Sequence, residues 1–294
     1  MPGLFFDNIN RKEFLSKSFG LASSLVLSSS TNLIFASKDK RTHLALLSDT
    51  HVAEDKDNNF RGFYPYNNLK RVVPDILKAK PLGVLINGDV ARLTGEKGDY
   101  ENVKSLLAPI AQKIPVYMTM GNHDYRDNFF TVFPVASEEP VVNKHISIIE
   151  NADSRILLLD SLLYVDKVAG LLGYNQREWL ATFLESAKPK PTILFVHHTL
   201  GDKDSDLLDS QRLFDVIQPH DQVKAIFYGH SHEYKVEKRG NIHLINLPAV
   251  GYNFADKEPI GWVEANIGMS GVDLLLHTIG GNQSQNGQTI SIRW

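Results

Sequence analysis

Five short segments of this 294-residue chain carry side chains that bind metal ions, and each segment follows an apolar, strand-like run. The segments read Asp49-Thr50-His51, Gly88-Asp89, Gly121-Asn122-His123-Asp124, His197-His198 and Gly229-His230-Ser231-His232. Six of the eleven histidines fall in them, which chance would rarely arrange. Their imidazole, carboxylate and amide groups are nitrogen and oxygen ligands of the kind that hold Mn, Fe or Zn. The recurrence of these residue types therefore predicts that the five segments form one metal-binding site together.

Each segment is a weak signal when it stands alone. A turn aspartate and a surface histidine would explain Asp49 and His51, and loops are rich in Asn and Asp for conformational reasons. In the last segment, His230 and His232 lie on the same side of an extended backbone, which is a spacing suited to ligands. The argument for a site comes from the recurrence of the pattern after five different strands.

The elements that carry these segments are typical of an α/β domain. From His43 onward, apolar runs of strand length alternate with helical patterns, which predicts a largely parallel sheet. Because ligands bind at the carboxyl ends of strands in open α/β sheets, the five segments are expected to meet in one crevice. Pro74 predicts a late start or a kink in the first helix. Asn175 with Glu178 three residues later predicts a capping box. The expected strands are 43–48, 84–86, 116–120, 192–196 and 224–228, and the expected helices are 68–80, 100–112 and 210–218.

Composition limits the possible partners. The formal net charge of −3 gives no basic footprint for a nucleic-acid backbone, so no nucleic-acid partner is expected. The chain has no cysteine, which excludes thiolate metal sites, disulfides and thiol nucleophiles. Any metal must therefore be held by nitrogen and oxygen atoms.

The first forty residues have the layout of an export signal. Arg11-Lys12 opens a basic segment, an apolar and Ser-rich stretch follows, and Ala36 lies near a possible cleavage point. The segment resembles a twin-arginine signal with Lys12 in the second Arg position. We therefore expect residues 1–40 to be an export signal or a disordered N-terminus, and residues 41–294 to form one domain. The alternative is an ordinary N-terminal helix and a cytoplasmic protein. No membrane span is expected in the mature chain.

In this order, the motifs D-x-H, G-D, G-N-H-D, H and G-H-x-H resemble those of the calcineurin-like metallophosphoesterases. The resemblance runs from about His43 to Val250. Leu159-Asp160-Ser161 and Trp179-Leu180 are similar to the branch that contains class III cyclic-nucleotide phosphodiesterases and glycerophosphodiesterases. Thr199 departs from that branch, which commonly has Pro after the histidine pair. The resemblance implies a four-layer α/β/β/α sandwich.

The resemblance also implies a set of ligands. Asp49, His51, Asp89 and His232 would hold one metal ion, and Asp89, Asn122, His197 and His230 would hold the other. Asp89 would bridge the two ions. His197 is assigned as the ligand of its pair, and His198 would then contact a ligand or face the substrate.

The chemistry that follows is binuclear-metal hydrolysis of a small-molecule phosphoester, most simply a phosphodiester. A metal-bridging hydroxide would attack phosphorus, and His123 would act as general acid with Asp124 orienting its ring. A phosphomonoesterase of acid-phosphatase type needs the same metals, and a non-catalytic scaffold would keep the same fold.

Residues 53–66 form a plausible wall or lid of the site. Arg92, Tyr125 and Arg126 are equally plausible as substrate contacts and as solvated loop residues. The metals and the oligomeric state stay open.

Overall fold

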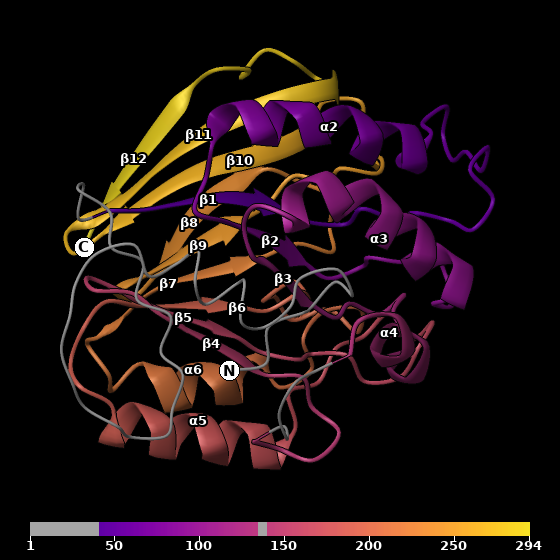
Figure 1. Cartoon of the computed structure of the whole chain (residues 1–294). Helices are drawn as coiled ribbons and strands as arrows, with labels where there is room; N and C mark the ends of the chain where they lie inside the picture. Colours follow the sequence, from indigo (N-terminus) through magenta and orange to yellow (C-terminus); the bar gives the residue numbers. More distant parts are fainter. Residues whose placement is uncertain (1–40, 135–139) are drawn as a thin grey trace, which may run out of the picture.

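The computed structural model describes residues 41–134 and 140–294. The predicted export signal, in residues 1–40, lies outside the described residues. Within the described part, two six-stranded sheets pack face to face, and helices cover the outer face of each (Figure 1). This arrangement is the four-layer α/β/β/α sandwich expected from the motifs.

The first sheet has the strand order β12-β11-β10-β1-β2-β3. Strands β1, β2 and β3 are parallel, whereas β10, β11 and β12 add to them in antiparallel fashion. The sequence predicted a largely parallel sheet, whereas both sheets of the structure are mixed. The strands of this sheet are β1 (Thr42–Leu47), β2 (Gly83–Asn87), β3 (Val116–Thr119), β10 (Pro259–Gly268), β11 (Gly271–Gly281) and β12 (Thr289–Arg293).

The second sheet has the strand order β4-β5-β6-β7-β9-β8. Its four central strands are parallel and its two edge strands are antiparallel. Strands β4 and β5 form an antiparallel hairpin whose turn contains Asn151, Ala152 and Asp153. The strands of this sheet are β4 (Ser147–Glu150), β5 (Arg155–Leu158), β6 (Thr192–Phe195), β7 (Val223–Tyr228), β8 (Lys235–Arg239) and β9 (Ile242–Asn246).

Three apolar cores hold the layers together. In β1, Ala45 and Leu47 face helices, whereas Leu44 and Leu46 face the second sheet, as the period-two pleat requires. The third core lies between the second sheet and its two helices. Helices α2 (Pro65–Ala79), α3 (Lys97–Ala111) and α4 (Arg126–Val132) pack on the first sheet, and α5 (Tyr174–Ser186) and α6 (Ser210–Ile217) pack on the second.

The late start predicted for the first helix and the capping box at Asn175 are both wrong. Helix α2 begins at Pro65 and continues through Pro74. Pro74 is solvent-exposed, so water can hydrate the carbonyl that lost its hydrogen-bond donor. The capping box at Asn175 does not form, because α5 has Gly173 as its N-cap and no side-chain cap bond. The Asp209 carboxylate fixes the entry to α5 instead, by accepting hydrogen bonds from the backbone N–H of Leu172 and Gly173.

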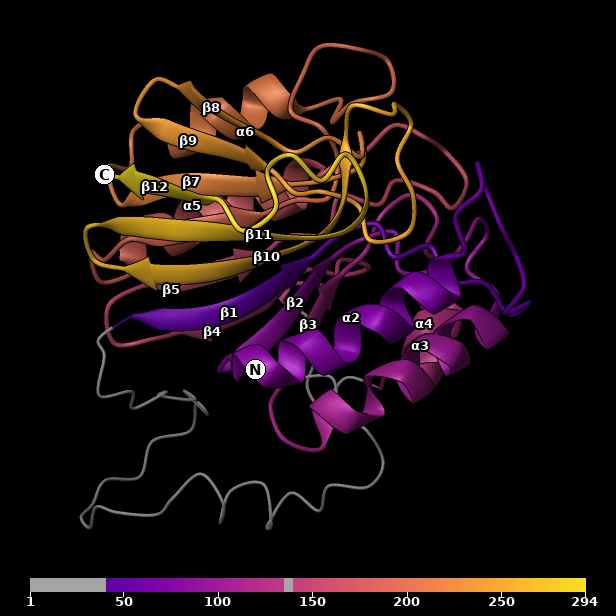
Figure 2. The ribbon, with the colours of Figure 1, turned by 90° about the horizontal axis from the view of Figure 1, so that it is seen from above.

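The topology places the ends of the parallel strands, and the five segments that follow them, at one edge of the sandwich. Figure 2 shows the arrowheads of β1, β7 and β9 directed to the side of the molecule where long loops meet. The isolated bridge between Ser48 and Ala249 joins the ends of β1 and β9, and so links the two sheets at that edge. None of the described helices combines the length and the apolar character needed to cross a bilayer.

Candidate metal centre

The five predicted segments meet where the parallel strands end. Backbone hydrogen bonds tie the first two together, since the N–H of Asp49 donates to the Gly88 carbonyl at 3.1 Å and that of His51 to the Asp89 carbonyl at 3.0 Å. The Gly229 N–H donates to the His197 carbonyl at 2.9 Å and ties the last two segments together. The ligand positions are thus fixed by backbone as well as by side chains.

The backbone is locally unfavourable at these positions. Among the described residues, nine non-glycine residues have a positive φ, and five of them belong to the predicted ligand set. A left-handed conformation costs roughly 1–2 kcal/mol for a residue with a Cβ. Such strain concentrates at functional sites because the surrounding structure imposes it. The five are Asp49, His51, Asp89, His230 and His232.

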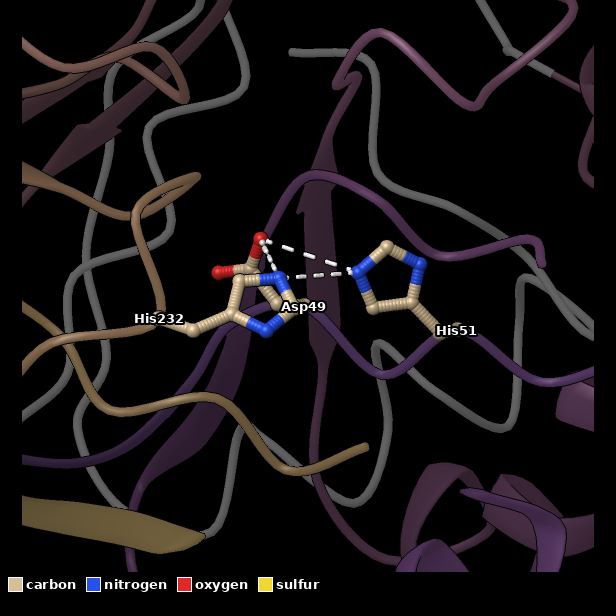
Figure 3. A group of neighbouring side chains, drawn as sticks. All are labelled: Asp49, His51 and His232. Atoms are coloured by element: carbon tan, nitrogen blue, oxygen red, sulfur yellow. Dashed lines mark hydrogen bonds and ion pairs between the residues drawn. The ribbon is translucent and has the colours of Figure 1, made fainter. Parts of the chain in front are cut away.

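Asp49, His51 and His232 form the first group of possible ligands (Figure 3). Their side chains point toward one another, with His51 Nε2 at 3.1 Å from His232 Nε2 and His232 Nε2 at 3.3 Å from Asp49 Oδ1. All three are buried. Two imidazole nitrogens and a carboxylate oxygen at these distances suit a single divalent cation.

Asp89, His197 and His230 form a second group beside the first. Asp89 Oδ2 lies 3.3 Å from His197 Nε2 and 3.7 Å from His51 Nε2, so it faces both groups. A third combination, His51 with Asp89 and His123, also has the distances of a metal site. Asp89 therefore lies where the sequence places a bridging ligand.

A buried polar atom without a partner tests whether this site fits metal ions. Asn122 Oδ1 is buried and, within the described residues, has no hydrogen-bond partner. An unpaired buried acceptor costs about 1–3 kcal/mol unless a ligand satisfies it. This atom belongs to a residue predicted as a metal ligand. The donor set therefore fits the cations that the motifs imply.

Backbone carbonyls orient the imidazole rings. Ligand histidines usually donate their second ring N–H to such an acceptor, which fixes the tautomer. In His197 and His232 the Nδ1 atom makes this bond, which leaves Nε2 for a metal, whereas in His230 the Nε2 atom makes it and leaves Nδ1. The contacts are His197 Nδ1 to the Asn87 carbonyl at 2.7 Å, His232 Nδ1 to the Tyr252 carbonyl at 2.6 Å, and His230 Nε2 to the Ser205 carbonyl at 3.1 Å.

The charges of the buried side chains favour a bound cation. Burial opposes ionisation of Asp49, but His232 and His197 outweigh it and lower its pKa to about 2. Burial also disfavours a charged His197, but Asp89 and Asp49 raise its pKa to about 10. Burial lowers the pKa of His51 to about 3 and that of His230 to about 4. A metal at His197 Nε2 must therefore displace a proton, whereas the other two imidazoles have free lone pairs.

His198 lies beside the ligands and away from the cavity. Its ring is buried, its Nδ1 lies 2.8 Å from Ser161 Oγ, and its ring centroid is 4.8 Å from that of His230. A Cβ at Gly170 would fall 2.3 Å from the His198 ring, so only glycine fits there. Of the two roles expected for His198, contact with a ligand matches this placement, since His198 is not among the described residues that line the cavity.

The predicted role of Asp124 is wrong. Its carboxylate accepts hydrogen bonds from the backbone N–H of Val90, Ala91 and Gly121 and from the Tyr100 hydroxyl. Burial and the nearby Asp89 charge raise the pKa of Asp124 to about 6. Asp124 thus fastens the second and third segments together.

The His123 ring is oriented by a different group. Its Nδ1 lies 2.8 Å from the Leu93 carbonyl, which leaves Nε2 as the free ring nitrogen. The backbone N–H of His123 donates to Asp89 Oδ1 at 2.9 Å. His123 lines the cavity beside the ligands, where a general acid has to be.

Two of the three residues whose role the sequence left open have carboxylate partners. Arg126 binds Asp160 through two guanidinium nitrogens, and Tyr125 donates to Asp127. The Arg92 guanidinium lies over the Phe60 and Tyr252 rings, at 5.1 and 5.4 Å from their centroids.

The expected wall or lid at residues 53–66 acts indirectly. None of these residues is among the described ones that line the cavity. Phe60 packs on Tyr252, whose ring stacks on His51 at 4.6 Å between centroids. The segment therefore supports His51 indirectly, through the Tyr252 ring.

A cavity of about 570 Å³ opens over the ligands. His51, Asp89, Asn122 and His123 line its inner end, and other residues extend it away from the metal positions. A volume in this range accommodates a small organic ligand. Two adjoining groups of histidine and aspartate side chains at one end of such a cavity, in an α/β/β/α sandwich, define a candidate centre for two metal ions.

The family follows from comparison with known proteins. The model of the calcineurin-like phosphoesterase family matches residues 42–234, and the chain belongs to this family. The match covers all five segments, as the motifs predicted. The chain is therefore a metal-dependent phosphoesterase.

Two curated proteins that are similar to this chain are named as phosphodiesterases. The chain is 27% identical over 225 residues to the 3',5'-cyclic adenosine monophosphate phosphodiesterase CpdA of Pseudomonas aeruginosa, with 74% of this chain and 79% of the relative covered. It is 28% identical over 233 residues to the glycerophosphodiester phosphodiesterase GpdQ of Enterobacter lignolyticus, with 74% and 81% covered. Both names fall in the branch that the motifs indicated.

A solved structure confirms the fold. A dimetal phosphatase from Danio rerio superposes with a TM-score of 0.66 at 14% identity, covering 86% of this chain and 98% of that chain. At this sequence identity, the structural similarity is evidence for the fold alone.

Proposed function

We propose that this protein is a phosphodiesterase that holds two metal ions and hydrolyses small phosphodiesters. The observation that carries the proposal is the position of Asp89 between two ligand groups, one built on Asp49 and the other on His197. The curated relatives named above are phosphodiesterases, which supports a diester over a monoester.

The residues divide into two ligand sets that share one carboxylate. Asp49, His51 and His232 would hold one ion, Asn122, His197 and His230 the other, and Asp89 both. When bound, the ions supply a water of lowered pKa and offset the negative charge of the phosphate. The ligand atoms are nitrogen and oxygen only, which suits Mn, Fe or Zn.

His123 would transfer the proton that the leaving alcohol needs. Its Nδ1 is held by the Leu93 carbonyl, so Nε2 is the nitrogen that can donate on the cavity side. Its backbone is held by Asp89, which fixes the ring relative to the bridging ligand. A general acid in this position contributes about 10²–10⁴-fold for a poor leaving group.

A direct assay tests the reaction class. The metal-stripped protein is reloaded with Mn²⁺, Zn²⁺ or Fe, and the hydrolysis of bis(p-nitrophenyl) phosphate is compared with that of p-nitrophenyl phosphate. We expect metal-dependent turnover with a higher kcat/KM for the diester. A faster monoester would identify a phosphatase of acid-phosphatase type. No turnover of either ester by a protein that holds two ions would contradict the proposal.

The leaving-group dependence of His123→Ala tests the proton transfer. An alkoxide needs a proton and a p-nitrophenolate does not, so we expect the variant to lose about 10²-fold or more on an alkyl ester and far less on an aryl ester. The measurement is kcat on a matched pair, methyl p-nitrophenyl phosphate and dimethyl phosphate, or on a more reactive alkyl diester. Equal losses on both esters would remove the acid role.

A further inference from the structure

Residues 251–254, in the loop between β9 and β10, lie against the first ligand group. The N–H of Gly251 donates to the Asp49 carbonyl at 2.9 Å, and a Cβ at Gly251 would fall only 3.0 Å from the carbonyl oxygens of Asp49 and Thr50. The family model ends at residue 234, so these four residues lie outside the matched region. None of the five sequence motifs includes them, and their contact with the metal centre requires its own explanation.

The position of the 251–254 segment is fixed from both sides. The Asn68 side chain, on α2, donates to the Gly251 carbonyl at 2.8 Å. The Asn253 side chain donates to the Glu258 carbonyl at 2.7 Å, at the entry to β10. The segment is therefore a fixed surface against which ligand side chains can be oriented.

Tyr252 makes two different contacts with the first ligand group. Its ring stacks on the His51 ring at 4.6 Å between centroids, with 26° between the ring planes. Its backbone carbonyl lies 2.6 Å from His232 Nδ1, where it accepts the ring N–H. Tyr252 is 3% exposed, so its ring has little freedom to move. One residue thus holds the plane of one imidazole and the tautomer of the other.

Phe254 adds a second aromatic contact to His232. The two rings stack at 4.3 Å between centroids, and the Tyr252 ring lies 4.8 Å from the same imidazole. An imidazole that binds a cation carries part of the positive charge, which the negative face of an aromatic ring stabilises. These contacts therefore favour the metal-bound form of His232.

The second ligand group has a different surrounding. Among the described residues, the ring contacts of His197 and His230 are with imidazoles alone. A change in the 251–254 segment should therefore affect one of the two ions and not the other.

We propose that Tyr252 and Phe254 are positioning residues for one metal ion, the ion that Asp49, His51 and His232 would hold, here called the first ion. Tyr252 acts through the plane of His51, and both aromatic rings act on His232. The two residues set the affinity for the first ion through these imidazoles. This inference rests on the proposed two-ion centre.

A pair of substitutions tests the Tyr252 ring. Tyr252→Leu removes the stack on His51 and leaves the backbone carbonyl in place, so we expect about tenfold weaker binding of Mn²⁺ as the first ion, because loss of a group that orients a ligand weakens metal binding by about 10–100-fold. Tyr252→Phe keeps the ring and should keep the full affinity. Anomalous diffraction from crystals equilibrated with limiting Mn²⁺ measures the occupancy of each ion separately.

Phe254→Leu tests the second contact without disturbing a buried position. Phe254 is 51% exposed, so its loss should cost the fold little. We expect a loss of about two- to tenfold in affinity for the first ion, the range that an aromatic pair contributes. This variant tests the proposal even if Tyr252→Leu does not fold.

Phe214→Leu is the matched control. Phe214, on α6, is fully buried in the core behind the second sheet, away from the metal centre. Its substitution should lower the Tm of the metal-free protein. It should leave the occupancy of both ions, and the rise in Tm on addition of Mn²⁺, unchanged.

The outcomes separate this inference from the proposed function. Unchanged occupancy of the first ion in both Tyr252→Leu and Phe254→Leu would overturn the inference, and so would an equal loss of both ions. An equal loss in Tyr252→Phe and Tyr252→Leu would overturn the role of the ring. An unmodified protein that binds no Mn²⁺ at the first group would instead contradict the two-ion centre. Two bound ions without turnover of any diester would contradict the proposed activity alone.

Discussion

Asp89→Asn is expected to lose about 10³-fold in kcat/KM on bis(p-nitrophenyl) phosphate, since the metal ions contribute several kcal/mol and each tenfold is worth about 1.4 kcal/mol. The reason is the position of Oδ2, at 3.3 Å from His197 Nε2 and 3.7 Å from His51 Nε2. An amide nitrogen in place of this oxygen has no lone pair to share between two cations. The substituted protein should bind fewer than two ions per chain, measured by elemental analysis.

The fold should survive this substitution. Asp89 has a φ of 47°, and Asn is among the few residues that adopt the left-handed conformation readily. The amide oxygen can still accept the hydrogen bond that the His123 N–H gives to Asp89 Oδ1. Asp75→Asn, on the exposed face of α2, makes the same chemical change away from the site and should keep full activity. Two ions per chain and activity within tenfold of the unmodified protein would show that Asp89 does not bridge.

The sequence could predict which residues meet at the site, because their side chains carry the signal. Asp49, His51 and His232 are recognisable by residue type, and the strands before them are recognisable as apolar runs. The partners that orient the rings could not be predicted, because the carbonyls of Asn87, Tyr252 and Ser205 belong to the backbone and have no sequence signature.

The role given to Asp124 was wrong for a related reason. Adjacency to His123 suggested a contact, but the chain turns after Gly121, and the carboxylate binds N–H groups of its own turn and of the loop after β2. Hydrogen bonds across 33 or 34 positions are set by the packing of β2 beside β3, and no local pattern reveals them.

Elements of the fold were predictable in proportion to their burial. The central strands β1, β2 and β7 are apolar and were found from sequence to within one or two residues. Edge strand β8, which reads Lys-Val-Glu-Lys-Arg, was missed because its side chains are mostly polar and solvent-exposed. Its existence depends on pairing with β9, which is a tertiary effect.

Gly121→Ala is expected to disrupt the metal centre with one added carbon. A Cβ at this position would lie 2.2 Å from Asp89 Oδ1, 2.4 Å from Asp89 N and 2.6 Å from His197 Nε2. The Asp89 backbone cannot retreat freely, since its carbonyl accepts the His51 N–H at 3.0 Å. Gly121 is itself held by its N–H bond to Asp124 Oδ2 at 2.9 Å. The ligand side chains must therefore move.

Because a displacement of about 1 Å near the chemistry costs about 10²-fold, we expect at least that loss in kcat/KM on bis(p-nitrophenyl) phosphate. The affinity for the ion at His197 should fall with it. The direct measurement is the rise in Tm on addition of Mn²⁺, which reports metal binding to the folded state independently of catalysis. The rise should be smaller for Gly121→Ala than for the unmodified protein.

Gly280→Ala is the matched control, because its Cβ would come no nearer than 3.7 Å to another heavy atom, on the Phe63 ring. That variant should keep the full activity and the full rise in Tm. If Gly121→Ala behaved like Gly280→Ala, the loop after β3 would be free to move away from Asp89, and the ligand positions would not be fixed by the backbone. Loss of metal binding in Gly121→Ala alone would instead show that the glycine is required for the close approach of two ligands.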